Sequence, residues 1–206
     1  MIDNTQKIAQ VLLDTRAVRL NVNTPYIFAS GIKSPIYCDN RFLLGFPEAR
    51  NIIIDAFLEN SLVQDAEVIA GTSTAGIPWA AIIADHLKKP LAYVRAESKD
   101  HGVGKTVEGA EVANKKTVVI EDLISTGASS KKVLDNLLTE NALVTGVVAI
   151  FSYEFLEVTT VFENTPYHTL STFSTLLQIA RETNILNDIE CSIASEWNSS
   201  PRTWKI

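Results

Sequence analysis

The sequence predicts an α/β protein with a doubly wound, mostly parallel sheet flanked by helices and a small N-terminal hood. Three observations lead to this class. From residue 66 onward, short apolar runs follow one another, helical stretches separate them, and a β-rich segment broken by Pro25, Gly31 and Pro35 precedes them. Such apolar runs are typical of parallel strands buried on both faces, which need helices as crossovers.

The N-terminal part is predicted to form two helices with a flap between them. Apolar residues at helical spacing predict a helix over 5–18, and a second helix over 47–59 begins with a proline suited to a first turn. The intervening segment, VRLNVNTPYIFASGIKSPIYCDNR, has short β-rich stretches and turn residues. We therefore expect a small antiparallel hood over about 19–42.

The remaining elements follow from the four apolar runs AEVIAGT, PLAYVR, KTVVIED and LVTGVVAIF, each predicted to be a strand. Helical stretches over 77–88 and 129–140 separate them. The tail over 182–206 is expected to form a final helix and arm. Only residues 96–114 form a long stretch with no predicted element, and so long a connection in a compact domain is typically functional or disordered.

Composition narrows the class of function. The formal net charge of -6 supplies no basic stripe for nucleic acid, so an anionic partner must be bound locally, as a small ligand is. The two cysteines, Cys38 and Cys191, lack the spacing of a zinc site or a disulfide framework. No signal peptide or membrane span is predicted, and we expect a cytoplasmic protein with neither nucleic-acid nor membrane partners.

The end of the predicted strand KTVVIED carries the strongest functional signal. Glu121 and Asp122 follow an apolar run, and the turn after them contains hydroxyl residues around Gly127. At the carboxyl end of such a strand, a turn of this kind offers hydroxyls, N-cap groups and backbone N–H groups to a phosphate. The acids repel a phosphate, so they favour sugar hydroxyls or Mg²⁺. The pattern favours a sugar phosphate; the alternative is a pair of acids that caps the next helix.

This strand and turn resemble the 5-phosphoribosyl 1-diphosphate motif of the type I phosphoribosyltransferases. Three further segments resemble the other blocks of the orotate phosphoribosyltransferases, in the same order: FASGIKSPIYCDNR at 28–41, GTSTAGIPWAAIIADHL at 71–87 and AYVRAESKDHGVGKTVEGA at 92–110. The resemblance implies one phosphoribosyltransferase domain over 1–206. It also implies transfer of the 5-phosphoribosyl group from 5-phosphoribosyl 1-diphosphate to orotate, giving orotidine 5′-monophosphate and diphosphate in pyrimidine biosynthesis.

Arg95, Lys99 and His101 match the RxxxKxHG pattern of the family's mobile catalytic loop, here about 96–110. In relatives this loop closes over the site of the neighbouring subunit, so the resemblance implies a homodimer whose lid acts across the interface. Cations that arrive with a lid stabilise a departing diphosphate. The alternative is that the three side chains are solvated surface charges.

The resemblance assigns the site residues in three groups. Lys99, His101 and Asp122 would be catalytic, and Mg²⁺ would be bound through the substrate without a direct protein ligand. Orotate would meet Lys33, Ile36, Tyr37 and Ser125, although Tyr37 fits a core position equally well. The diphosphate substrate would be bound by Arg95, Lys99, His101, Glu121, Asp122, Leu123, Ile124, Ser125, Thr126, Gly127, Ala128 and Ser129.

The chain departs from the family's pattern at several positions. Ala29 and Ala96 stand where some members have a basic residue, and Ala75 stands where some relatives carry a lysine. No arginine follows the strand LVTGVVAIF, where some members use one against orotate. These departures leave open which group neutralises the orotate carboxylate.

Two other functions are compatible with parts of the sequence. The first is a phosphoribosyltransferase that accepts a purine or uracil, which the flap sequence disfavours. The second is a regulator that senses 5-phosphoribosyl 1-diphosphate and binds nucleic acid. The acidic net charge and the intact RAESKDHG segment disfavour this regulator, which would want a basic face.

Overall fold

The computed structural model describes residues 3–28, 31–97 and 105–205 of the chain. The helices are α1 (Asn4–Asp14), the 3₁₀ helix η1 (Asn40–Gly45), α2 (Pro47–Leu58), α3 (Ser61–Gln64), α4 (Gly76–Leu87), α5 (Ala128–Thr139), α6 (Glu157–Val161), α7 (Phe173–Glu182) and α8 (Asp188–Ser199). The strands are β1 (Val18–Leu20), β2 (Tyr26–Ile27), β3 (Lys33–Ser34), β4 (Ile36–Cys38), β5 (Val68–Thr72), β6 (Leu91–Val94), β7 (Val107–Gly109), β8 (Lys116–Ile124), β9 (Leu143–Ser152) and β10 (Tyr167–Thr172).

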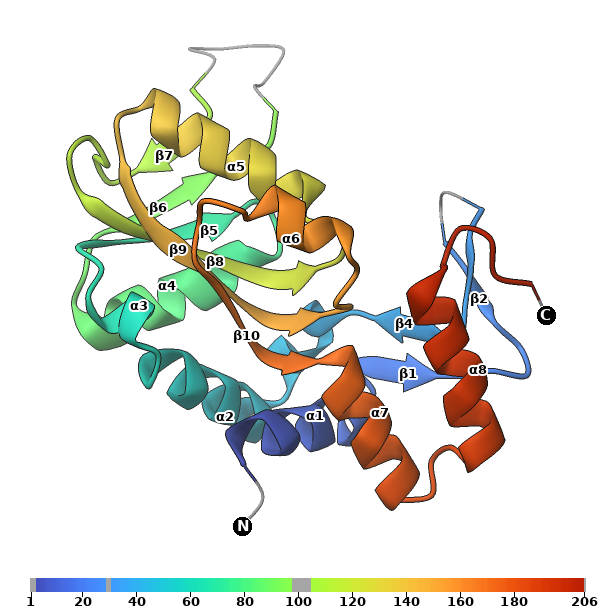
Figure 1. Ribbon diagram of the computed structural model, residues 1–206. Helices are drawn as coiled ribbons and strands as arrows, with labels where there is room; N and C mark the ends of the chain where they lie inside the picture. Colours follow the sequence, from blue (N-terminus) through green and yellow to red (C-terminus); the bar gives the residue numbers. More distant parts are fainter. Residues whose placement is uncertain (1–2, 29–30, 98–104, 206) are drawn as a thin grey trace.

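A six-stranded sheet in the order β10-β9-β8-β5-β6-β7 forms the centre of the molecule. Its strands pair in parallel except for β7, which is antiparallel to β6. Helices α1, α2 and α4 cover one face, and α5 and α6 lie over the other (Figure 1). The predicted fold class, a mostly parallel sheet between helices, is confirmed.

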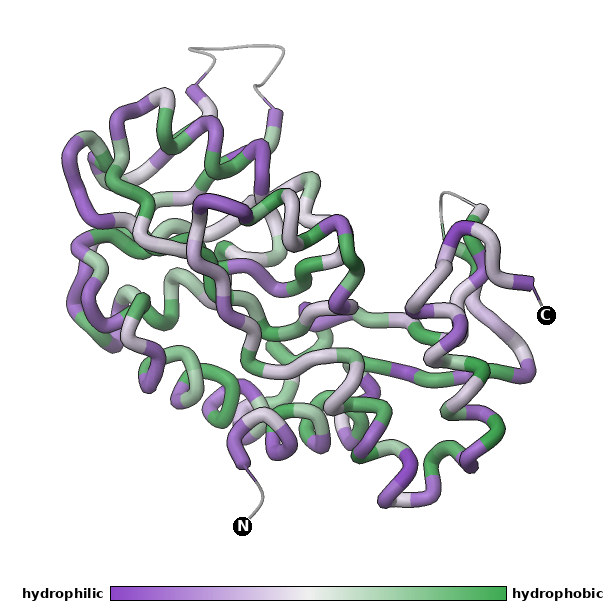
Figure 2. Tube along the Cα trace, viewed as in Figure 1, coloured by the Kyte–Doolittle hydropathy of each residue, from purple (hydrophilic) through white to green (hydrophobic). Residues whose placement is uncertain are grey.

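The sheet is central because its strands are apolar on both faces. All five residues of β5 are buried, and the middle of β8 and most of β9 are buried as well. Figure 2 shows hydrophobic colour along these strands and hydrophilic colour on the outward sides of the helices. Burial of such apolar surface is the main favourable term in folding.

The hood consists of two small antiparallel pairs, β1 with β4 and β2 with β3, followed by η1. It lies beyond the carboxyl ends of β8 and β9, whose arrowheads point toward it (Figure 1). The predicted antiparallel flap is therefore confirmed. The hood thus lies over the strand ends, which is where ligands bind in open α/β sheets.

Several predicted boundaries are wrong in detail. The first helix ends at Asp14, because Arg16 adopts a left-handed conformation (φ 60°) and the chain then enters β1, so Val18 is a strand residue. The stretch 96–114 contains β7, which adds an edge strand to β6. Strand β10 and helix α7 have no counterpart among the predicted elements.

Within the described ranges, no helix combines the length and the apolar content of a membrane span.

Candidate active site

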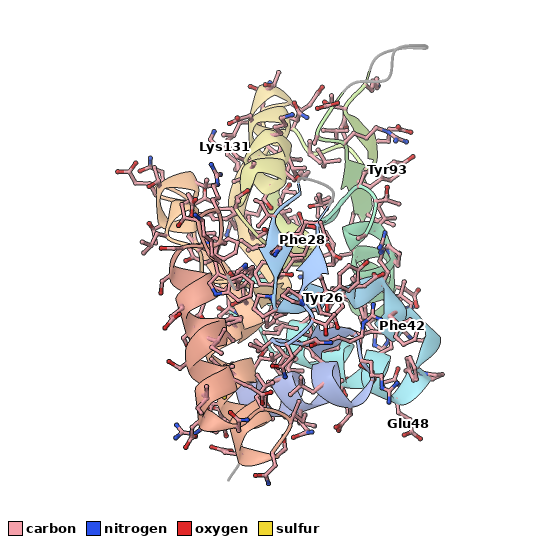
Figure 3. The ribbon with its side chains drawn as sticks, turned by 90° about the vertical axis from the view of Figure 1, so that its right-hand side faces the viewer. Tyr26, Phe28, Phe42, Glu48, Tyr93 and Lys131 are labelled. Carbon is pink, nitrogen blue, oxygen red and sulfur yellow. The ribbon has the colours of Figure 1, made fainter. Side chains whose placement is uncertain are left out.

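The strand ends bring four separate chain segments to one edge of the sheet. Because β6, β5, β8 and β9 lie side by side in parallel, the residues at or just beyond their carboxyl ends share this edge. In sheet order these are Arg95, Ser73, the Glu121–Asp122 pair and Tyr153. In Figure 3, which looks onto the hood, Tyr26 and Phe28 lie near the centre of the view, with Lys131 of α5 above them on one side and Tyr93 of β6 on the other.

Glu121 is turned into the protein. Its side chain is 5% exposed, and its two carboxyl oxygens accept hydrogen bonds from the Asp122 backbone N–H (3.1 Å) and the Ser130 hydroxyl (3.1 Å). Burial, followed by the neighbouring Asp122 carboxylate, raises the pKa of Glu121 to about 8. At neutral pH this carboxyl is therefore mostly protonated, and it can donate a hydrogen bond.

Asp122 is half-buried and faces the hood. Burial raises its pKa, while its hydrogen bond with Glu121 and the charge of Arg41 oppose that shift. The Asn40 side chain of η1 donates a hydrogen bond of 2.6 Å to the Asp122 carbonyl oxygen. The acidic strand end is thus joined directly to the hood, and of the two acids Asp122 is the one more available to a ligand.

The turn after these acids leaves its backbone donors available. Among the described residues, no hydrogen-bond acceptor is found for the backbone N–H groups of 125–129. Gly127 precedes α5 with a positive φ of 79°, and an added Cβ would lie 3.0 Å from a Val161 methyl carbon. Successive N–H groups around such a residue at a helix N-terminus form an anion-binding concavity.

The hydroxyls of this turn do not act as helix caps. The residue before α5 is Gly127, and no side chain caps the helix. The N-cap groups that the sequence predicts in this turn are therefore not formed. The Ser130 hydroxyl, which lies inside α5, binds Glu121 instead. Ser125 and Thr126 are partly exposed at the rim, beside the N–H groups.

The segment GTSTAG forms the tight connection from β5 to α4. Gly76 begins α4 so close to β8 that an added Cβ would lie 2.4 Å from the Ile120 carbonyl oxygen. The buried hydroxyls of Thr72 and Ser73 have no hydrogen-bond partner within the described residues. Buried polar groups are usually satisfied, so two such hydroxyls at the strand edge indicate a place where a polar ligand binds.

The loop after β6 is described only at its two ends. Arg95 forms an ion pair with Glu108 of β7 (3.1 Å) while its guanidinium lies 5.9 Å from the centre of the Tyr93 ring. Lys99 and His101, the other two predicted loop residues, lie outside the described residues. Ala29, one of the departures from the family's pattern, lies outside them as well.

The predicted base-binding residues of the hood lie on two successive strands, Lys33 on β3 and Ile36 and Tyr37 on β4, and they differ in exposure. Lys33 is exposed, Tyr37 is partly buried, and the Ile36 side chain is fully buried in the core. Only the backbone of Ile36 is therefore placed to meet a ligand. Tyr37 packs against Tyr26, with their ring centres 5.5 Å apart, and the Arg19 guanidinium lies 4.9 Å from the centre of the Tyr37 ring.

Sequence reasoning missed Asn40 and Arg19. The Asn40 side chain is fully buried, and its place within the block SGIKSPIYCDNR is a signal that could have identified it. Arg19 lies opposite Tyr37 in the pairing of β1 with β4. A single arginine in a short strand carries no comparable signal.

No group of three or more His, Cys, Asp or Glu side chains within the described residues could hold a metal ion. Asp122, the more exposed of the two acids, is nevertheless a carboxylate that could face Mg²⁺, whereas the Glu121 carboxyl is buried and hydrogen-bonded. In phosphate-ester sites Mg²⁺ keeps several waters and is bound by one or two carboxylates together with substrate oxygens. The donor set thus fits a cation that arrives with a phosphorylated substrate.

Comparison with known proteins gives consistent matches. Residues 48–154 match the family described as the phosphoribosyl transferase domain. The chain is 45% identical to the orotate phosphoribosyltransferase of Lactococcus lactis over 98% of both chains, and 44% identical to that of Enterococcus faecalis over 97% of both. Its fold is similar to the crystal structure of orotate phosphoribosyltransferase from Aeropyrum pernix, with a TM-score of 0.76 and 28% identity over 87% of this chain and 99% of that one.

Proposed function

The chain belongs to the phosphoribosyl transferase family and, within it, to the orotate phosphoribosyltransferases, and we propose how its residues bind the two substrates. The enzyme transfers the 5-phosphoribosyl group from 5-phosphoribosyl 1-diphosphate to orotate and releases diphosphate, a step of pyrimidine biosynthesis. One observation carries the assignment of residues. At one edge of the sheet, the partly exposed Asp122 lies close in the chain to the backbone N–H groups of 125–129, for which no acceptor is found within the described residues.

The 5′-phosphate binds in the turn over 125–129. Its backbone N–H groups have no competing acceptor within the described residues, and the positive end of the α5 dipole lies behind them. Leu123 and Ile124 complete the binding segment as the last residues of β8, where they fix the start of the turn.

The ribose hydroxyls bind at the acidic strand end. Asp122 accepts hydrogen bonds from them, because it is the more exposed of the two acids. The Glu121 carboxyl, held by Ser130, accepts a hydrogen bond from the Asp122 backbone N–H and so keeps Asp122 in place. Its remaining donor and acceptor positions are available to the ribose hydroxyls. As C1 becomes oxocarbenium-like, the negative charge of Asp122 stabilises the ribose ring.

The diphosphate binds between the GTSTAG connection and the catalytic loop. The hydroxyls of Thr72 and Ser73 supply donors, and Arg95 lies one strand away. Lys99 and His101 add positive charge as the loop closes, so that the bond from C1 to the diphosphate oxygen breaks toward a neutralised leaving group. Mg²⁺ that arrives with the substrate would lie near Asp122 and would supply further charge neutralisation.

Orotate binds between the hood hairpin and the strand ends. Lys33, the backbone of Ile36, Tyr37 and the Ser125 hydroxyl would hold it with N1 facing C1 of the ribose. The N1 anion forms the new bond as the diphosphate leaves with its electron pair, so no general base is needed at the nucleophile. Catalysis is then mainly positioning and electrostatics.

The assembly and location of the enzyme follow the family pattern. We propose a homodimer in which the loop over about 96–110 closes the partner subunit's site. Cys38 and Cys191 are both free thiols, which suits a reducing compartment, and we propose that the enzyme acts in the cytoplasm.

The first experiment follows loss of orotate absorbance with 5-phosphoribosyl 1-diphosphate and magnesium. Lys99→Ala should reduce turnover by about 10²-fold or more, as expected for loss of a group that stabilises transition-state charge. Lys105→Ala, a described neighbour with no assigned role, is the control and should keep most of the activity. Wild-type turnover in Lys99→Ala would contradict the role of the loop.

Subunit mixing tests whether the loop acts in trans. Lys99→Ala and Asp122→Asn subunits, each nearly inactive alone, should regain part of the wild-type activity as heterodimers, because one of the two shared sites would then be intact. Confirmed subunit exchange without any recovery would contradict the proposed arrangement.

A further inference from the structure

Helix α8 packs beside the hood rather than on the central sheet (Figure 1). Its start is fixed by a capping box in which the side chains of Asn187 and Glu190 each accept a hydrogen bond from the backbone N–H of the other. The last helix of the chain thus lies next to the hood.

Trp197 of α8 connects this helix to the β2–β3 hairpin of the hood, which carries Lys33. Its side chain is fully buried, and its indole N–H donates a hydrogen bond of 3.0 Å to the Lys33 carbonyl oxygen, 164 residues away in the chain. The indole ring packs against Tyr153, Phe155 and Phe173, with ring centres 5.5 to 5.9 Å apart. The indole is thus held by an aromatic cluster while its one polar atom reaches the hood.

Two further hydrogen bonds join α8 to the rim of the sheet and to the hood. The Asn198 side chain donates to the carbonyl oxygen of Tyr153, just beyond β9, at 2.6 Å. The Asn23 side chain, from the loop before β2, donates to Glu190 at 3.0 Å. Helix α8 is therefore bonded to the sheet rim and to the hood at the same time, and it sets the distance between them.

The hairpin needs this external support. Strands β2 and β3 have only two residues each, and their pairing is limited to Tyr26 with Ser34 and Ile27 with Lys33. A two-stranded hairpin of this size is at best marginally stable in water. Its position over the strand ends must come from contacts outside the hairpin, and the Trp197 bond to Lys33 is one that acts on the strand itself.

We propose that Trp197 is a positioning residue for orotate, which fixes the backbone of the hood at Lys33 through the carbonyl of that residue. This inference rests on the proposed function, because it assumes that orotate meets residues 33–37. It assigns a role in the base site to the C-terminal helix, which touches neither the phosphate turn nor the acidic pair in any hydrogen bond described above.

The test is Trp197→Phe, which keeps an aromatic ring and removes the N–H donor. Loss of one hydrogen bond predicts a rise of about three- to tenfold in KM for orotate, with KM for 5-phosphoribosyl 1-diphosphate within about twofold of wild type. The matched control is Trp79→Phe. Trp79 is also fully buried, but its indole N–H has no partner within the described residues, so the control loses similar volume and no hydrogen bond.

A second variant guards against a general loss of folding in Trp197→Phe. Asn23→Ala removes the exposed bond to Glu190 and leaves the core untouched. It should raise KM for orotate by about twofold, a smaller effect because the bond is solvent-exposed. Equal rises in both KM values for Trp197→Phe, together with a lower melting temperature, would indicate a merely structural residue and overturn the proposal.

Hydrogen exchange separates failure of this inference from failure of the proposed base site. Orotidine 5′-monophosphate should protect the amides of 31–38 in the wild type, and these amides should exchange faster in free Trp197→Phe. Protection in the wild type with an unchanged KM for orotate in Trp197→Phe would overturn the role of Trp197 alone. Absence of protection in the wild type would overturn both proposals.

Discussion

The two parts of the candidate active site, the phosphoribosyl side on the sheet and the base side in the hood, are built in opposite ways. The phosphoribosyl side comes from one continuous segment, in which β8 pairs with β5 on one edge and β9 on the other and leads directly into the turn before α5. The base side consists of strands of two or three residues that depend on side chains from distant parts of the chain. The first side is fixed by the sheet, and the second by long-range hydrogen bonds together with the burial of Val18, Ile36 and Leu43 in the core.

This difference suits the two substrates. A ribose phosphate needs rigid donors and a charged acceptor, which a central strand and a helix N-terminus provide. The choice of base depends on the hood, whose strands lie outside the central sheet. Function is thus carried by the site while the fold supplies its rigid half.

The sharpest test of the phosphoribosyl side is Asp122→Asn. Removing the negative charge should lower kcat by about 10²-fold, because the acceptor that faces the developing ribose charge is lost. The fold should survive, since the Asn40 bond goes to the backbone carbonyl of Asp122 and not to its side chain. Steady-state kinetics with both substrates measures the effect.

Asp135→Asn on the exposed face of α5 is the matched control for that variant. Asp135 pairs with Lys131 at the surface, and this pair is expected to contribute little. Its kcat should equal that of the wild type. A loss of activity as large as that in Asp122→Asn would show that charge anywhere near the turn matters, and the special position of Asp122 would be refuted.

Gly76→Ala tests how rigid the sheet side is. The new Cβ would lie 2.4 Å from the Ile120 carbonyl oxygen, a backbone atom of a central strand that cannot move aside cheaply. Overpacking of this kind should lower the free energy of unfolding by about 1 to 3 kcal/mol, measured by urea denaturation. Gly45→Ala in η1 is the control. Its new Cβ has nothing within 4 Å, so the free energy of unfolding should change by less than about 1 kcal/mol. Equal effects would mean that the rim is as adaptable as the hood.

The same contrast explains what could be predicted from the sequence. The strand, the acids and the Gly127 turn are contiguous, so local patterns identify them before any tertiary contact is known. Their position at the carboxyl end of a parallel strand then follows from the fold class. The hood was predicted only as an antiparallel flap, because short strands and turn residues are also local signals.

The remaining features depend on pairs that no local pattern reveals. Asn40 and Asp122 are 82 residues apart, and Trp197 and Lys33 are 164 apart. The Ser130 hydroxyl looks like a helix cap in the sequence, and only the packing of α5 on β8 shows that it binds Glu121. Strand β10 was missed because it is a half-exposed edge strand without a continuous apolar run.

Asn40→Ala breaks the link between the two sides. The Asp122 carbonyl oxygen loses the hydrogen bond from the fully buried Asn40 side chain, which predicts a loss of about 1 to 3 kcal/mol in the free energy of unfolding and about a tenfold lower kcat/KM. Urea denaturation and initial-rate kinetics give the two values. Unchanged kcat/KM alongside lower stability would mean that the hood holds its place without Asn40.

The last test concerns the pH dependence of stability at Glu121. Its pKa in the folded protein is raised to about 8 by burial and by Asp122, whereas an unfolded chain loses this proton near pH 4.3. Between these values the folded state binds more protons, so the free energy of unfolding falls as pH rises. Glu121→Gln cannot titrate and should lack this slope, so the wild type should lose stability relative to it between about pH 5 and pH 8. Parallel urea midpoints over that range would mean that Glu121 is already ionised beside Asp122.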